Sequence, residues 1–117
     1  MYAYRVILDH LRAATFLIAD GVVPSNKDQG YFARRLVRRA VRYARDLNID
    51  VQFASEIAAS YIDIYNKQYP ELLKKREYIL SELSKEEEQF GKTLKQGLRE
   101  FEKQFDDFFM KNQITKD

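Results

Sequence analysis

Apolar residues recur every three or four positions along nearly the whole chain, and this spacing is typical of packed helices. The pattern is interrupted at a few glycines and prolines, and the predicted helices cover residues 3–19, 30–47, 51–67 and 71–111. Strict alternation of apolar and polar residues, the mark of a half-buried strand, does not occur in the sequence. We therefore expect an all-α fold, a helical bundle of about four to five helices with a long C-terminal helix.

The first predicted helix, residues 3–19, is apolar around nearly its whole circumference and is expected to be mostly buried. Its narrow polar stripe places Arg5, Asp9 and Arg12 at spacings that allow surface ion pairs. His10 falls on the apolar side. We predict a hydrogen-bonded histidine in the core, with a functional histidine as the alternative.

A polar turn, residues 21–29, joins the first two predicted helices. Gly21 suits the left-handed conformation that often ends a helix, and Pro24 stiffens the chain after it. Asn26 or Asp28 is expected to cap the second helix, because short polar side chains accept hydrogen bonds from the free N–H groups of a first helical turn.

The second predicted helix, residues 30–47, has one strongly basic face. At about 100° per residue its arginines fall within an arc of roughly 140°. They are Arg34, Arg35, Arg38, Arg39, Arg42 and Arg45. Neighbours one turn apart repel by roughly a few tenths of a kcal/mol per pair, and only Asp46 lies nearby in the sequence as a counter-charge. We therefore expect a nucleic acid to supply the missing charge, with an anionic membrane surface or an acidic protein as alternatives.

The predicted C-terminal helix carries an acidic triplet and an apolar stripe. Ser84 and Glu87 have the spacing of a capping box, so we expect a bend or a new helix start near Ser84. There Glu86, Glu87 and Glu88 would complement the helix dipole, and they diverge too much to hold a metal ion. The stripe consists of Phe90, Leu94, Leu98, Phe101, Phe105 and Phe108.

Composition narrows the possible functions. Residues 1–50 carry nine Lys/Arg against five Asp/Glu, and eight of the nine are arginine, whose planar fork of donors suits phosphate. Cysteine is absent and histidine occurs once, which excludes disulfides and Cys/His metal sites. Without an apolar run of the roughly 20 residues that span a membrane, we expect a soluble, cytoplasmic protein. Without a phosphate loop or nucleophile motif, we expect a binding module with no catalytic, cofactor or metal residues.

Three ordered stretches resemble alanyl-tRNA synthetases and cover nearly the whole chain. They are RVILDHLRAATFLIADGVVPSNKDQGYFARRLVRRAVRYA, YPEL at 69–72 and EEEQFGKTLKQGL at 86–98, and the first is similar to bacterial members. The resemblance implies that residues 1–117 form a single helical tRNA-recognition domain, which follows the class II catalytic core in a larger alanine tRNA ligase. ATP with magnesium and a zinc ion in the editing domain are then expected in the parent enzyme. Its catalytic and editing domains are expected partners of this fragment. The fragment is not expected to be active alone.

The resemblance also implies residue roles. Asn26 matches the asparagine that reads the G3·U70 wobble pair in the acceptor stem of tRNA(Ala). The cations expected to bind the tRNA backbone are Lys27, Arg34, Arg35, Arg38, Arg39, Arg42 and Arg45. This chain departs from the family at Gln29, where arginine is common. The family's second reader, an aspartate in a YDTYGFP-like segment, is expected beyond Asp117.

RNA chemistry supports this assignment. The minor groove of A-form RNA is wide and shallow, so a loop side chain reaches base edges there. A G·U wobble leaves the guanine 2-amino group unpaired, and an asparagine amide offers both a donor and an acceptor to such an edge. Because phosphate contacts position a protein while base contacts specify sequence, we expect the loop to discriminate and the arginines to anchor.

Two other hypotheses stay open. One is a general helical RNA- or DNA-binding module without sequence preference, and the other is a protein-interaction bundle with an acidic partner. Hairpins with G·U or G·C at the third position separate specific from general binding. Six phosphate contacts predict a log–log salt slope of about −5, whereas an acidic-protein binder would bind RNA weakly even at low salt.

Overall fold

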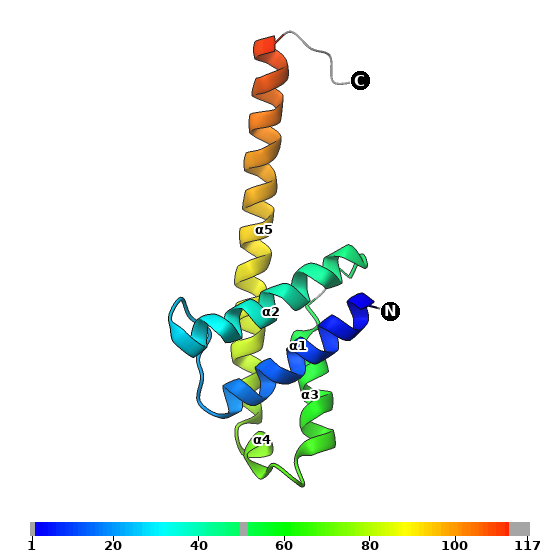
Figure 1. Cartoon of the computed structure of the whole chain (residues 1–117), viewed down its shortest axis with the longest axis vertical. Coiled ribbons are helices and arrows are strands. Elements are labelled where there is room, and N and C mark those ends of the chain that lie inside the picture. The colour runs from blue at the N-terminus through cyan, green and yellow to red at the C-terminus, as the bar shows by residue number, and fades with distance from the viewer. Residues whose placement is uncertain (1, 50–51, 113–117) are drawn as a thin grey trace.

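The computed structural model describes residues 2–49 and 52–112, and every regular element in these ranges is an α-helix (Figure 1). The helices are α1 (Tyr2–Ala19), α2 (Asp28–Asp46), α3 (Ala54–Tyr65), α4 (Pro70–Lys74) and α5 (Arg76–Asn112). The predicted all-α bundle with a long C-terminal helix is therefore confirmed. None of the described helices is both long and apolar enough to cross a bilayer.

The helices form a bundle at one end of an elongated molecule. α1 and α2 lie side by side and cross α5, while α3 packs along the first half of α5 (Figure 1). The second half of α5 extends past the other helices, which accounts for principal extents of 64 × 31 × 20 Å.

The core lies where α1, α2, α3 and the first half of α5 meet. Its largest fully buried apolar side chains are Leu11, Ile18, Val37, Ile62, Leu72, Ile79 and Leu83. Burying each one stabilises the fold by about 1.5–3 kcal/mol relative to exposure. α2 contributes mostly small residues, since Ala33, Ala40 and Ala44 are fully buried, and small side chains let neighbouring helices approach closely.

Two left-handed residues shape the ends of the first two helices. Gly21, two residues after α1 ends at Ala19, has a φ of +100°, as predicted. Asn48, with a φ of 63°, plays the same part after α2, where the Ile49 N–H donates to the Ala44 carbonyl at 2.9 Å. α1 is less buried than its composition suggested, because Tyr4 and Leu8 are exposed.

The C-terminal half differs from the sequence-based prediction. No bend or new start occurs near Ser84: α5 runs unbroken through it, and the break lies between α4 and α5, at Lys75. Glu87 therefore does not cap its own helix. Its carboxylate accepts hydrogen bonds from the backbone N–H groups of Phe53 at 3.1 Å and Ala54 at 3.2 Å, where α3 begins.

The apolar stripe of α5 is covered only where it adjoins the bundle. Phe90 packs against the core, whereas Leu98, Phe101, Phe105 and Phe108 are exposed. None of the other described helices reaches this part of α5 (Figure 1). The far half of α5 is therefore held by its own backbone hydrogen bonds and by ring contacts such as Phe101 with Phe105.

Candidate nucleic-acid interface

The loop between α1 and α2, residues 20–27, folds back on the first turn of α2. Ser25 holds it, because its N–H donates to the Gly30 carbonyl at 3.0 Å and its Oγ accepts from the Lys27 N–H at 3.3 Å. The predicted side-chain cap is wrong: α2 begins at Asp28 with Lys27 at the N-cap position and no side-chain cap hydrogen bond. The Ser25 bond to Gly30 ends on a carbonyl, so it ties the loop to α2 without binding the free N–H groups that a cap would satisfy.

Asn26 is exposed in this loop and makes a contact that the local sequence did not indicate. Its side-chain oxygen Oδ1 accepts a hydrogen bond from Nη1 of Arg34, two turns along the basic helix. Its amide nitrogen has no hydrogen-bond partner within the described ranges. Asn26 is therefore attached to the basic face of α2 through Arg34 and does not cap the helix.

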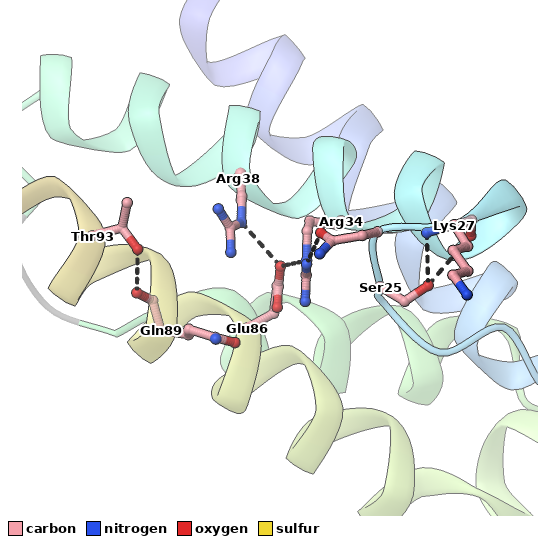
Figure 2. Close-up of polar contacts among 8 residues, drawn as sticks. Ser25, Lys27, Arg34, Arg38, Glu86, Gln89 and Thr93 are labelled. Atoms are coloured by element: carbon pink, nitrogen blue, oxygen red, sulfur yellow. Dashed lines mark hydrogen bonds and ion pairs between the residues drawn. The ribbon is translucent and has the colours of Figure 1, made fainter.

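Glu86 of α5 is the counter-charge of the basic helix. Its Oε1 accepts from Nε of Arg34 at 2.6 Å and from Nε of Arg38 at 3.0 Å (Figure 2). The Glu86 side chain is only 4% exposed, and a carboxylate buried to that extent requires charged or hydrogen-bonding partners. The expectation that only Asp46 lies nearby as a counter-charge is wrong, because residues about fifty positions apart meet here.

The basic face of α2 is consequently divided. Arg34 and Arg38 turn toward α5, with side chains 18% and 27% exposed. Arg45 is half-buried on the same side, close to Gly91. Of the cations predicted to bind the tRNA backbone, Arg35, Arg39 and Arg42 on α2 and Lys27 in the loop are exposed and open to a partner.

Aromatic rings lie under several of these guanidinium groups. The Arg38 group lies 5.0 Å from the Phe90 ring centroid, and those of Arg39 and Arg42 lie 5.6 and 5.7 Å from Tyr43. Such cation–π contacts restrict the side chains while leaving their N–H donors available. The arginines therefore present a partly ordered surface.

The arginines border an open hollow of about 430 Å³. Its lining residues are His10, Phe32, Arg35, Leu36, Arg38, Arg39, Arg42 and Phe90. His10 is half-buried at its edge, so the prediction of a core histidine is wrong. Burial lowers the pKa of His10, Arg39 lowers it further and Asp9 opposes the shift, so the imidazole is mostly neutral at pH 7.

The structure thus brings only some of the predicted site residues together. These are Asn26, Arg34 and Arg38, joined through Glu86, which the sequence analysis had assigned to its own helix dipole. The signal that pointed to Glu86 was the unbalanced positive charge of α2, which required a carboxylate from elsewhere in the fold. Within the described ranges, no cluster of three or more His, Cys, Asp or Glu side chains is arranged to hold a metal.

Comparison with known proteins gives one consistent result. Residues 1–117 match the family model described as tRNA synthetases class II (A). An alanine–tRNA ligase of Borreliella afzelii is 50% identical over 99 residues, which are 83% of this chain and 17% of that protein. One of Pseudoalteromonas translucida is 47% identical over 103 residues, 88% of this chain and 12% of that protein. One of Pelotomaculum thermopropionicum is 47% identical over 95 residues, 81% and 11% respectively. The chain therefore spans less than a fifth of the length of these relatives.

Proposed function

The chain belongs to the class II tRNA synthetases, among the bacterial alanine–tRNA ligases, and on this premise we propose that residues 1–117 are the helical tRNA-recognition domain of such an enzyme. The domain binds the acceptor stem of tRNA(Ala) and contributes to recognition of its G3·U70 wobble pair. The parent polypeptide attaches alanine to this tRNA.

The observation that carries the proposal is the exposed row of Arg35, Arg39 and Arg42 beside the α1–α2 loop. The row spans about 10 Å of helix at 1.5 Å per residue. Guanidinium groups bind phosphate oxygens through two donors at once, and Lys27 adds a fourth exposed cation at the loop. These contacts hold a stem in register against the loop.

Asn26 lies at the loop end of this row, exposed and tied to α2 through Arg34. When the arginines hold the phosphates, the Asn26 side chain lies on the side of the domain that meets the shallow minor groove of the stem. Base-edge contacts made there supply the sequence preference that phosphate contacts lack.

The remaining steps of alanylation belong to other parts of the parent enzyme. We place ATP with magnesium in its catalytic domain and zinc in its editing domain, and we regard both domains as partners of this chain. We expect the parent enzyme to act in the cytoplasm.

Titration with two acceptor-stem hairpins tests the proposal. The hairpins differ only in a G·U or a G·C pair at the third position, and binding is measured at several salt concentrations. We expect tighter binding to the G·U stem by about 1–3 kcal/mol. Equal affinities would favour a general nucleic-acid-binding bundle, and weak binding of both stems at low salt would favour an acidic protein partner.

A further inference from the structure

We propose that Glu86 is a positioning residue for RNA recognition, because its buried carboxylate holds Arg34, and Arg34 in turn holds the side-chain oxygen of Asn26. Asn26 then presents its amide NH₂ group, and not its oxygen, to the RNA. The inference rests on the proposed binding of an acceptor stem and adds a specificity determinant on α5.

Arg34 connects the two ends of this chain of contacts. Its Nε donates to Glu86 at 2.6 Å, while Nη1 of the same guanidinium donates to Oδ1 of Asn26. The guanidinium is planar and rigid, so fixing Nε also fixes the direction of Nη1. With a side chain only 18% exposed, Arg34 has little freedom to turn away.

Glu86 is itself held firmly. The same oxygen that binds Arg34 accepts from Arg38 at 3.0 Å (Figure 2). The Arg38 guanidinium also lies over the Phe90 ring. The carboxylate is also removed from water, which strengthens its hydrogen bonds to charged groups. α5 therefore sets the geometry of a loop that is about sixty residues earlier in the sequence.

This geometry selects the chemistry of the base contact. An asparagine amide has one acceptor oxygen and a nitrogen with two donor hydrogens, and here the oxygen is already engaged by Arg34. Asn26 consequently donates to acceptors on the minor-groove edge, such as guanine N3 or the pyrimidine O2. Both pairs carry these acceptors, but the wobble displaces the pyrimidine relative to its place in a G·C pair, so a donor held in one fixed position distinguishes the two. The free 2-amino group of guanine is a donor, so it requires an acceptor other than Asn26.

Glu86 also binds Arg34 and Arg38, which are then unavailable to phosphate. Its role can therefore be measured through RNA binding. The E86Q variant loses the charge that binds Arg34 and Arg38 and frees both arginines. We expect it to bind the G·C stem more tightly, to steepen the salt slope by up to about two, and to lose the G·U preference. A purely structural role for Glu86 predicts weaker binding of both stems together with a lower Tm.

Two matched substitutions separate positioning from charge. R34K and R38K both keep a positive charge that faces Glu86, but only Arg34 contacts Asn26. Lysine has one nitrogen and no planar fork, so it does not hold Glu86 and Asn26 in one fixed geometry. We expect R34K to lower the G·U over G·C affinity ratio by about tenfold, and R38K to change it by less than about twofold. Equal effects of the two substitutions would overturn the inference.

The E88Q variant is the control for charge on α5, because Glu88 is the exposed neighbour of Glu86 and pairs with Lys92. We expect it to leave the affinity ratio unchanged.

Nitrogen-15 NMR of the free 117-residue protein tests the geometry without RNA. We expect the Arg34 Nε–H and the Asn26 side-chain amide to give shifted, exchange-protected signals that E86Q abolishes and E88Q preserves. Unchanged Asn26 signals in E86Q would overturn the positioning role alone. A wild-type protein without G·U preference would instead overturn the proposed function, and the recognition role of Glu86 with it.

Discussion

Gly30 shows how one residue determines the shape of the α1–α2 loop. A Cβ at this position would lie 2.1 Å from the Ser25 Oγ and 2.4 Å from the carbonyl oxygen of Val23. The hydroxyl can rotate away, but the carbonyl belongs to the backbone and moves only if the loop moves. The loop that presents Asn26 therefore requires glycine at this point of α2.

The G30A substitution tests this requirement. We expect it to lower the free energy of unfolding by about 1–3 kcal/mol, because the added methyl group overpacks the loop. Urea unfolding measures the change. G97A is the matched control: nothing lies within 4 Å of its added Cβ, and alanine in the interior of α5 should stabilise by up to about 1 kcal/mol. Equal effects of the two substitutions would show that the loop tolerates a side chain.

Asn26 is the residue whose removal should affect preference more than affinity. We expect N26A to reduce the G·U preference by about 1–3 kcal/mol and to leave the salt slope unchanged, because it removes a base contact and no charge. The two acceptor-stem hairpins measure both quantities. An undiminished preference in N26A would remove Asn26 from the recognition site.

At the scale of elements, α5 stabilises the start of α3. Two backbone N–H groups at that helix end bond to the carboxylate of Glu87, a residue that is itself buried. Burial raises the pKa of Glu87 above 4.5, while the N–H groups of Phe53 and Ala54 and the charge of Arg45 oppose the shift. The net rise means that removing the carboxylate from water outweighs its favourable partners.

This balance predicts a pH effect with a definite sign. Because the folded-state pKa of Glu87 exceeds the unfolded value, its stabilising contribution is complete below the unfolded pKa and is lost as pH rises through the folded pKa. We expect the free energy of unfolding of the wild type, measured against E87Q, to fall as pH rises from about 4 to about 7. Urea unfolding at several pH values measures it, with E88Q as the exposed control. A difference that rises with pH would contradict the assignment.

The two halves of α5 should respond differently to truncation of apolar side chains. Leu83 is fully buried in the core, and we expect L83A to cost about 2–5 kcal/mol of unfolding free energy. Phe105 is exposed, its ring contacts in the described part of the chain are with Phe101 and Phe109 of the same helix, and F105A should cost less than about 0.5 kcal/mol. Similar losses in the two variants would show that the far half of α5 is buried in solution.

For the whole molecule, the ion pairs with Glu86 change the expected response to salt. Six free arginines would give a log–log slope of about −5, whereas four exposed cations, Arg35, Arg39, Arg42 and Lys27, give about −3.6. Titration of either hairpin over a range of salt concentrations measures the slope. R39A should flatten the slope by about one, and a wild-type slope near −5 would show that Arg34 and Arg38 leave Glu86 when RNA binds.

Much of this arrangement was predictable from local pattern. The apolar spacing predicted α1 and α2 to within a few residues, and the arginine spacing predicted one basic face. Prediction was poorer after Ser84, where capping-box spacing indicated a break that does not exist. The reason is that a carboxylate near a helix backbone bonds to whichever N–H groups packing brings close, and packing brought those of α3 to Glu87.

The sequence by itself determined the helices, the positive charge of α2 and the family of the chain. Helical periodicity and charge spacing depend on residues three or four positions apart, and family resemblance depends on residue order alone. Only the tertiary structure decided which arginines stay exposed, what holds Asn26 and where the apolar stripe of α5 meets solvent. Those outcomes depend on contacts between residues that are distant in the chain, and Glu86 reaches Arg34 only because α5 crosses α2 in the folded protein.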